Sequence, residues 1–371
     1  MQRSIVEMIN IWKSKLQEYY HKYETRLDVV FFICGFIFDA LLVTEIDHLF
    51  SLIQQAVYLF IVAFILHHEI LYRLHKWRPH GFVEKMWNYR NLLLHFLLGT
   101  LLNIYSLFYI KSASLISSII FLALMVGLII ANESTLVKKA KVSFKVGLFA
   151  ICLFSYMSIL FPLLLGFVGW TPFGLSVAAT LAFFYFQIRF LRAKLPDERT
   201  LFNAVLLPGI SVLLVFTLFY ALSWIPPVPL SVKMQGIYHL IEKKEGKYFL
   251  SSEKVWWRFW ETGDQQFKAR AQDKIYFYAQ IFSPARFADQ IFIQWLFKDP
   301  VRGWQKTDRI PLQIVGGRKE GFRGYTIKSN YQPGEWRVQV ETSMGHEISR
   351  MGFEVIADAS TEPRVFEVIA Q

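Results

Sequence analysis

The chain has 371 residues, of which 54% are hydrophobic, and its formal net charge is +11. Such an apolar composition excludes an ordinary soluble enzyme and indicates a membrane protein with several spans. The positive charge does not indicate nucleic-acid binding. Of the 40 Lys and Arg residues, 19 precede residue 226 and lie mainly in short connections between apolar segments, where basic residues set membrane orientation. We therefore expect no nucleic-acid partner.

The first segment, residues 1–28, carries apolar side chains at a spacing of three or four residues. These side chains are Ile5, Met8, Ile9, Trp12 and Leu16. The spacing predicts an amphipathic cytoplasmic helix that lies on the inner membrane surface. The alternative is that these residues extend the first membrane span into the cytoplasm.

Residues 29–225 contain nearly all of the long apolar runs and are expected to form a transmembrane helical domain. A span needs about 20 mostly apolar residues. Seven segments are predicted to cross the membrane: 29–44, 49–71, 91–110, 114–132, 146–168, 174–191 and 201–224. Pro162 and Pro208 fall inside the fifth and seventh of these segments, and each is expected to kink its helix.

Basic residues alternate between the connections of these seven segments. In chain order, the connections contain 5, 0, 5, 1, 4, 0 and 4 Lys and Arg residues, beginning with the N-terminal segment. Connections rich in Lys and Arg stay in the cytoplasm. The count therefore predicts a multi-pass protein of the cytoplasmic (inner) membrane. Its N-terminus is expected in the cytoplasm and its C-terminal domain in the periplasm, with the lipid bilayer as its first partner.

Two polar residues are expected at depth in the membrane. Asp39 is the acidic residue well inside the first predicted span, and Asn103 lies at a comparable depth in the third. A buried carboxylate must be protonated or paired, so Asn103 is a possible partner for Asp39. A structural hydrogen bond between helices is the commoner use of such residues, and a role in transport is the alternative.

A histidine-rich stretch, FILHHEILYRLHKWRPH, joins the second span to the following basic loop. His67, His68 and Glu69 lie near the cytoplasmic end of that span, and His95 begins the next span at a similar depth. Imidazole and carboxylate groups can bind metal ions or relay protons. However, adjacent helical residues point about 100° apart, and Glu69 precedes Arg73 by four residues, the order that favours a helical ion pair.

These observations favour interfacial polar residues with a local ion pair. A metal site would require His68 and His95 to meet between two helices, and the spacing alone assigns no metal ligand. No catalytic residue and no cofactor is assigned, since the sequence contains no nucleophile elbow, phosphate-binding loop or dinucleotide fingerprint.

The remaining chain changes to a repeat of two residues. Residues 226–271 are expected to form a hairpin and linker, with the hairpin at GIYHLIEKKEGKYFL, and residues 272–371 a β-sandwich domain. Alternating stretches are KIYFYAQIF, QIFIQWLF, RIPLQI, GYTIKS, EWRVQVE and RMGFEVI. Short alternating strands separated by turn residues are typical of an antiparallel sandwich.

Tryptophans mark both the expected core and an expected binding surface of this part. Trp295 and Trp336 alternate with polar residues and are predicted to be buried. Trp304 lies in a turn, whereas Trp256 and Trp257 are adjacent and cannot both face one side of a strand. Exposed aromatic side chains suit a protein, lipid or glycan partner, so Trp256, Trp257 and Trp304 are candidate binding residues. The hairpin sequence around His346 is expected to be a surface turn.

The end of the chain, QPGEWRVQVETSMGHEISRMGFEV, has the form P-G-x-W-x-V-x-V…G…F-x-V. Over about residues 272–357 the sequence resembles a bacterial envelope family of unknown function, often found behind a multi-span membrane region. The resemblance implies an Ig-like fold and an envelope location, and it implies no catalytic residues.

The sequence as a whole predicts a polytopic α-helical membrane protein followed by an all-β, antiparallel, Ig-like sandwich. It favours a non-enzymatic envelope protein whose outer domain binds a protein, lipid or glycan. The alternative is a small transporter or membrane-embedded enzyme that uses the polar residues of the first three spans.

Overall fold

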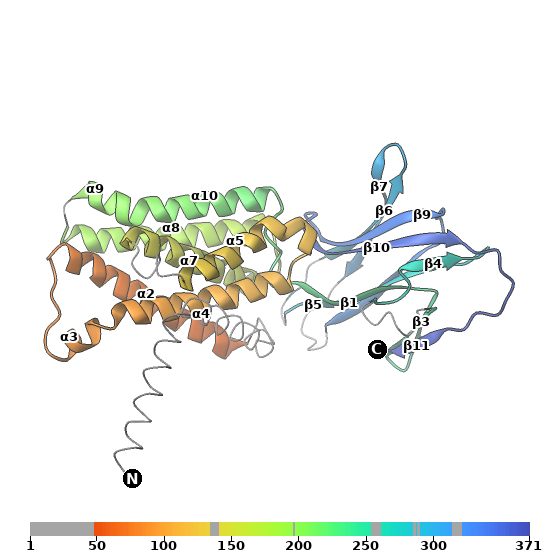
Figure 1. Ribbon diagram of the computed structural model, residues 1–371, viewed down its shortest axis with the longest axis horizontal. Helices are drawn as coiled ribbons and strands as arrows, with labels where there is room; N and C mark the ends of the chain where they lie inside the picture. The colour runs from red at the N-terminus through yellow and green to blue at the C-terminus, as the bar shows by residue number, and fades with distance from the viewer. Residues whose placement is uncertain are drawn as a thin grey trace, which may run out of the picture.

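The computed structural model describes residues 48–133, 141–195, 197–253, 261–284, 287, 290–313 and 321–371. These residues form a bundle of helices followed by a region of β-sheets, arranged end to end (Figure 1). The predicted amphipathic helix at 1–28, the first predicted span at 29–44 and Asp39 lie outside the described residues.

The helical region has five helices that are long and apolar enough to cross a membrane. They are α2 (Leu49–Arg73), α4 (Arg90–Lys111), α7 (Val142–Leu165), α8 (Trp170–Arg192) and the continuous helix of α9 (Glu198–Leu201), the π-helical turn η1 (Phe202–Leu206) and α10 (Leu207–Ala221). α5 (Leu115–Glu133) occupies the fourth predicted position, but its apolar part, Ile116–Asn132, is shorter. The expectation of seven spans is therefore not confirmed.

One predicted connection is mostly helical. GWTPF was expected to be a loop, but α8 begins at Trp170 and includes the residues that follow it. The turn is instead confined to Gly166–Gly169, where Gly166 has φ +80° and its N–H donates to the Pro162 carbonyl. Glycine adopts this left-handed conformation without steric cost and so ends α7 one turn earlier than predicted.

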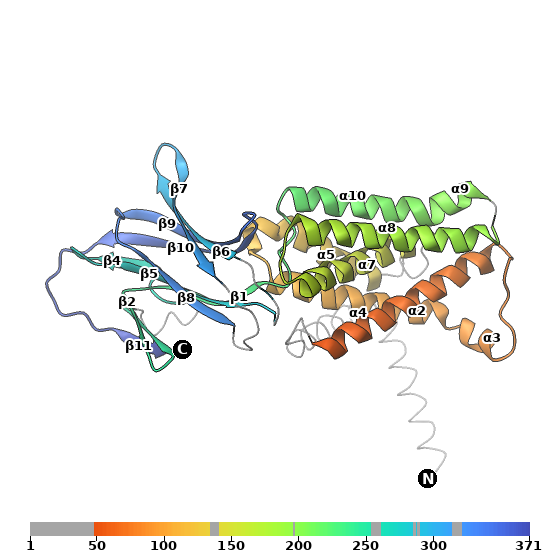
Figure 2. The same ribbon diagram turned by 180° about the vertical axis from the view of Figure 1, so that it is seen from behind.

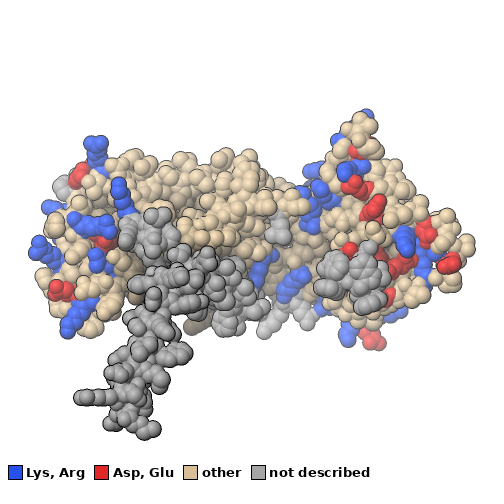
Figure 3. All heavy atoms as spheres, viewed as in Figure 1, with Lys and Arg blue, Asp and Glu red and all other residues tan. Residues whose placement is uncertain are grey.

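The two ends of the helical bundle differ in charge. Among the described residues, the connections rich in Lys and Arg, including the short helix α3 (Phe82–Trp87), lie at the end remote from the β-sheets (Figure 1). Figure 3 shows basic side chains at that end, then a broad uncharged surface along the helices, then charged residues again where the sheets begin. An uncharged band between two charged ends is the pattern expected of a bundle that crosses a bilayer.

The β-region contains three sheets. Its strands are β1 (Ser231–Tyr238), β2 (Leu240–Lys244), β3 (Lys247–Ser252), β4 (Gln266–Ala269), β5 (Ile275–Phe282), β6 (Gln290–Asp299), β7 (Gly303–Gln313), β8 (Phe322–Lys328), β9 (Gly334–Thr342), β10 (Glu347–Ala357) and β11 (Glu367–Ala370). The strand orders are β1-β5-β8, β4-β10-β9-β6-β7 and β11-β3-β2. All six alternating stretches predicted from the sequence lie on strands.

The first two sheets share one hydrophobic core and make the region sandwich-like. The core takes Phe277 and Ile281 from β5, Trp295 from β6 and Val338 from β9, all fully buried. Trp336 is also buried, so both tryptophans predicted to lie in the core do so. The prediction of a purely antiparallel fold is wrong at one edge, because β4 pairs with β10 in parallel.

The hairpin predicted at 236–250 is present as β2–β3. Its turn places Glu245 and Gly246 at φ +51° and +79°. Two consecutive residues with positive φ match the right-handed twist of the flanking strands, which explains the Gly at the second position. β11 then adds to the other side of β3, so the end of the chain returns to this hairpin.

Candidate functional site

A buried ion-pair cluster lies at the end of the helical bundle remote from the sheets. Glu69, near the end of α2, has a side chain only 1% exposed. One of its oxygens accepts from Arg73 Nε at 2.7 Å and the other from Arg90 Nε at 2.6 Å. The predicted Glu69–Arg73 ion pair is confirmed, and Arg90 is a second partner that the sequence alone did not indicate.

Neighbouring side chains extend this cluster to a third helix. Lys145 of α7 is buried, and its Nζ donates to the Asn91 side chain of α4 at 2.9 Å. Arg90 also stacks over the rings of Tyr72 and Trp87, with its Cζ 5.1 and 5.2 Å from their centroids. Aromatic faces attract cations, so these rings help to hold the guanidinium in place. We call Glu69, Arg73, Arg90, Asn91 and Lys145 the Glu69 cluster.

The histidines proposed as ligands point to different neighbours. The His68 ring lies 4.8 Å from that of Trp77, and its Nδ1 is 2.9 Å from the Phe64 carbonyl oxygen. His67 lies beside it with ring centroids 5.3 Å apart. His95 instead lines a cavity of about 10 Å³ beside Lys145 and Asn132, which is at the lower limit for one water molecule.

The Glu69 cluster contains one carboxylate among three basic side chains. Within the part of the chain that the structure describes, no group of three or more His, Cys, Asp and Glu side chains could hold a metal ion. Both Glu69 oxygens are engaged by arginines, which leaves the carboxylate poorly suited to accept a substrate proton. The cluster therefore serves to connect the ends of α2, α4 and α7.

Asn103 does not join this cluster. It is buried in α4, more than three turns beyond Arg90, where other polar side chains also lie between helices. There the Tyr109 hydroxyl lies 3.1 Å from that of Ser158 across α4 and α7. Since Asp39 lies outside the described residues, its pairing with Asn103 stays a prediction.

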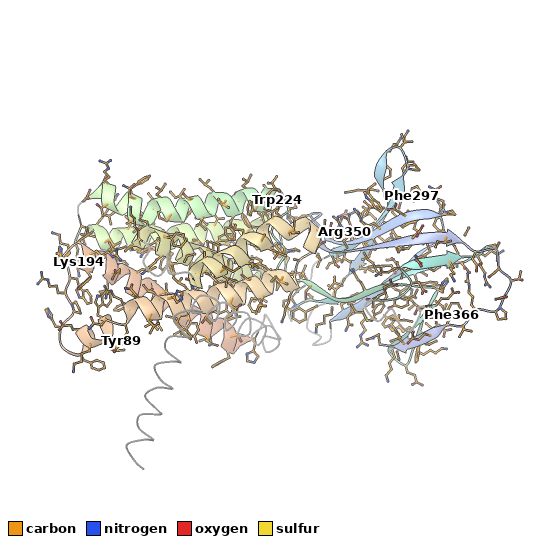
Figure 4. All side chains as sticks on the ribbon, in the orientation of Figure 1. Tyr89, Lys194, Trp224, Phe297, Arg350 and Phe366 are labelled. Carbon is orange, nitrogen blue, oxygen red and sulfur yellow. The ribbon has the colours of Figure 1, made fainter. Side chains whose placement is uncertain are left out.

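The β9–β10 hairpin contacts the other end of the bundle. His346 was expected in a surface turn, but it is only 6% exposed and its ring lies 4.8 Å from that of Tyr220 in α10. Ser114, between α4 and α5, hydrogen-bonds Glu347. Gly169 lies against the Met344 side chain, and its φ of +147° is a conformation that favours glycine. In Figure 4, Trp224 and Arg350 mark the two sides of this junction.

Of the candidate binding aromatics, Trp304 is described and is half-buried next to the turn of the β6–β7 hairpin, opposite Lys298. The Arg337 guanidinium stacks on the Trp304 ring, with its Cζ 3.9 Å from the ring centroid. The Lys298 Nζ lies 5.9 Å from the same centroid. The hairpin projects from the sheet (Figure 1), and Val301 at its tip is 93% exposed. Trp256 and Trp257 lie outside the described residues.

The β-region also contains a buried acid–base pair that the sequence did not reveal. His239 Nε2 lies 3.6 Å from Asp264 Oδ2, and both side chains are 4% exposed. The His239 ring stacks on Phe267 at 4.0 Å, and Asp264 accepts from the Glu253 N–H at 3.0 Å. Burial lowers the pKa of His239 to about 4 and raises the pKa of Asp264 to about 7.

These two pKa shifts make opposite contributions to stability. Because the pKa of Asp264 is raised, the folded state holds a proton between about pH 4 and 7 that the unfolded state has lost. The contribution of Asp264 to the stability of the fold therefore falls as the pH rises through this range. The lowered pKa of His239 makes its contribution rise with pH between about 4 and 6.5. The two effects largely cancel up to about pH 6.5.

We expect Asp264→Asn to separate these effects. The amide oxygen can keep the bond from Glu253, but the side chain no longer ionises. Relative to the wild type, the variant should gain stability as the pH rises from 4 to 8, by up to about 4 kcal/mol. The measurement is hydrogen exchange in β2 and β3 of the full chain, corrected for the intrinsic rate. If the variant and the wild type differ in stability by the same amount at pH 4 and at pH 8, the prediction is contradicted.

A strap of residues 358–366 connects β10 to β11 and is held by two arginines. Arg364, whose side chain is 11% exposed, pairs with Glu253 at 2.8 Å and Asp273 at 2.7 Å, and donates to the Lys268 carbonyl. Arg270 pairs with Asp358 at 2.7 Å. These contacts hold the end of the chain against β3 and β4.

The fold and these sites define a class of protein: a bundle of candidate membrane helices that carries a sandwich-like β-region. Within it, residues 288–355 match the model of a family described as "Protein of unknown function (DUF2914)". The match extends from just before β6 to β10, and it confirms the resemblance to a family of unknown function. No curated protein matches the chain.

Solved structures give only distant similarities. A β-glucosidase from Listeria innocua is 14% identical, with a TM-score of 0.20; the match covers 31% of this chain and 16% of that one. An immunoglobulin-like protein from Pseudomonas aeruginosa is 12% identical, with a TM-score of 0.19, and covers 32% of this chain and 96% of its own. Similarities at this level carry no argument about function.

Proposed function

We propose that this chain is a multi-pass protein of the bacterial inner membrane that presents an Ig-like sandwich in the periplasm for binding a protein partner. The proposal includes seven spans and a cytoplasmic N-terminus. The arrangement of charge supports it: the basic connections gather at one end of the bundle and the β-region lies at the other. The rule that basic connections stay inside then puts the β-region outside.

The β6–β7 hairpin carries the partner-binding part of the proposal. Asp299 accepts from the N–H groups of Val301 and Arg302, each at 2.8 Å, so the projecting tip is ordered by its own hydrogen bonds. Those bonds lower the pKa of Asp299. Trp and Arg, here Trp304 and Arg337, are enriched at the energetic centres of protein interfaces, and an ordered tip reduces the entropy lost on binding.

The alternative of a transporter or membrane-embedded enzyme has weaker support. Both oxygens of Glu69 are engaged by arginines, and His68 and His95 contact different neighbours. A lipid or glycan partner in place of a protein would give no crosslinked protein in the experiment below.

One set of cysteine variants tests orientation and binding together. In a background with Cys34 and Cys152 replaced by serine, Val301→Cys is expected to react with a membrane-impermeant maleimide added to spheroplasts. Arg78→Cys, in a basic loop, should react only after the membrane is permeabilised. A cysteine-to-amine crosslinker should then join Val301→Cys to a protein, and Trp304→Ala should reduce that product at least about tenfold.

A matched control is Lys243→Cys, on the exposed β2–β3 hairpin away from β6 and β7. Labelling of Arg78→Cys before Val301→Cys would overturn the proposed orientation. Equal crosslinking from Lys243→Cys and Val301→Cys, or none from either, would overturn the protein-binding role of the β6–β7 hairpin.

A further inference from the structure

A groove runs between α8 and the helix formed by α9, η1 and α10. Its volume is about 940 Å³. The two helices touch where a β-carbon on Gly209 would come within 3.1 Å of the Phe184 ring. Its lining includes the last residues of α8 and the first residues of α9. Figure 2 shows that these helix ends lie away from the β-sheets. Phe184 and Gly209 both line the groove, so the two helices are in contact within it.

The residues just before Pro208 form one side of this groove. In an α-helix the Ala204 carbonyl would accept from the N–H of residue 208, which proline lacks. The preceding turn, η1, instead has π-helical bonding, in which the Leu207 N–H donates to the Phe202 carbonyl. A π-turn adds a residue to the turn and is frequent at functional sites. Phe202 and Leu206 from this turn both line the groove.

The opposite wall is one face of α8. Leu181, Tyr185, Ile188 and Arg192 follow one another at spacings of four, three and four residues, so they lie on the same side of the helix. At a rise of 1.5 Å per residue, this row is about 16 Å long. Half of the hydrocarbon core of a bilayer is about 15 Å. The row therefore matches the length of one leaflet.

The end of the groove that lies away from the β-sheets is basic, whereas the rest of its lining is mostly apolar. This end is lined by three exposed arginines, Arg189, Arg192 and Arg199. Glu198 also lines it and pairs with Arg192 at 3.2 Å, so the lining keeps a net charge of about +2. Lys194, labelled in Figure 4, lies at the same end of the bundle. An apolar groove with arginines at one end is complementary to a phospholipid, whose apolar acyl chain is joined to a charged phosphate headgroup.

We propose that this groove binds one anionic phospholipid. An acyl chain lies against Leu181, Ile188 and Leu206, and the headgroup phosphate is held by Arg189 and Arg199. Guanidinium groups bind phosphate oxygens with two parallel hydrogen bonds. The net positive charge of the lining favours a phospholipid with a net negative charge over a zwitterionic one. This inference rests on the proposed membrane location of the helices and adds a ligand to it.

The test uses the full chain purified in a mild detergent and titrated with lipid under native mass spectrometry. Phosphatidylglycerol is the anionic probe and phosphatidylcholine, matched in acyl chains, is the zwitterionic one. We expect one phosphatidylglycerol to bind at least about tenfold more tightly than phosphatidylcholine. The double variant Arg189→Gln/Arg199→Gln should lose most of this preference. Leu181→Trp, which fills the apolar groove without changing charge, should weaken both lipids.

The matched control is Arg78→Gln/Lys85→Gln, which removes two exposed basic residues at the same end of the bundle but outside the groove. Equal weakening by both double variants would show a non-specific charge effect and overturn the site. So would competition of inorganic phosphate with lipid at equal concentration. Each variant is first checked for an unchanged unfolding temperature; Leu181→Trp gives an independent answer if the arginine pair fails that check.

Alkaline carbonate extraction of cell membranes separates this inference from the proposed function. If the wild-type chain is released by carbonate, the membrane location itself fails. If the chain stays in the membrane and the two lipids bind equally, the lipid site alone fails.

Discussion

Replacement of Glu69 by glutamine is expected to lower the free energy of unfolding of the helical bundle by about 3–5 kcal/mol. The Glu69 side chain is 1% exposed and forms ion pairs with both Arg73 and Arg90, while Lys145 lies nearby. Without the carboxylate, Arg90, which is only 18% exposed, keeps a charge with no ion-pair partner among the described residues. The measurement is a denaturant titration of the full chain in mixed micelles, followed by the loss of helical circular dichroism.

The control for this prediction is Glu84→Gln, which removes an exposed carboxylate from α3 at the same end of the bundle. It should change the free energy of unfolding by less than about 0.5 kcal/mol. The double variant Glu69→Gln/Arg90→Gln should be more stable than the sum of the two single effects predicts, because it also removes the stranded cation. Additive single effects would mean that the two residues do not act as a pair.

Replacement of Arg364 by glutamine is expected to release the strap and β11 from the β-region, at a cost of about 3 kcal/mol. The guanidinium pairs with Glu253 and Asp273 and donates to the Lys268 carbonyl, so its loss leaves two partly buried carboxylates without their common partner. Hydrogen exchange of the full chain should show loss of protection in β11 and β3, whereas β6 and β9 should keep theirs.

Arg302→Gln is the matched control, because Arg302 is exposed at the tip of the β6–β7 hairpin. It should leave exchange in β11 unchanged. If Arg364→Gln exposes every strand equally, the strap is part of the sandwich core and does not act as a separate clasp. If it exposes none, Arg270 and Asp358 suffice to hold the strap.

Much of the β-region could be predicted from the sequence, because its pattern is local. In β5, β6 and β9 the side chains that the alternation selects for the core, such as Trp295 and Trp336, are buried. Some side chains of the opposite face, such as Gln294 and Gln339, are buried as well, which the alternation did not predict. The parallel pairing of β4 with β10 could not be predicted in the same way. It joins residues that are about 90 positions apart, and alternation does not distinguish parallel from antiparallel neighbours.

The candidate sites depend on contacts between distant segments, and there the sequence was less informative. The Glu69–Arg73 pair follows from a spacing of four residues in one helix, so it was predicted. Arg90 reaches the same carboxylate only because the chain turns back after α2, where His75 adopts a left-handed φ of +56°. That turn also ends the helix at Arg73.

The His239–Asp264 pair and His346 illustrate a second limit. His239 and Asp264 stand 25 positions apart with no motif between them, and their burial comes from Phe267 and the strap. His346 follows a glycine in a hairpin, which is the signature of a surface turn. It is buried because a second part of the chain, the end of α10, covers it.

The junction between the bundle and the β9–β10 hairpin determines how far the β-region can reach. Only residues 222–230 separate α10 from β1, and the contacts of Ser114 with Glu347 and of Tyr220 with His346 tie a second point of the β-region to the bundle. A domain on a single flexible linker can take many orientations relative to the membrane, whereas a domain attached at two points is held in one orientation. The β6–β7 hairpin is therefore held in one position relative to the helices, and this position fixes where the proposed partner would bind.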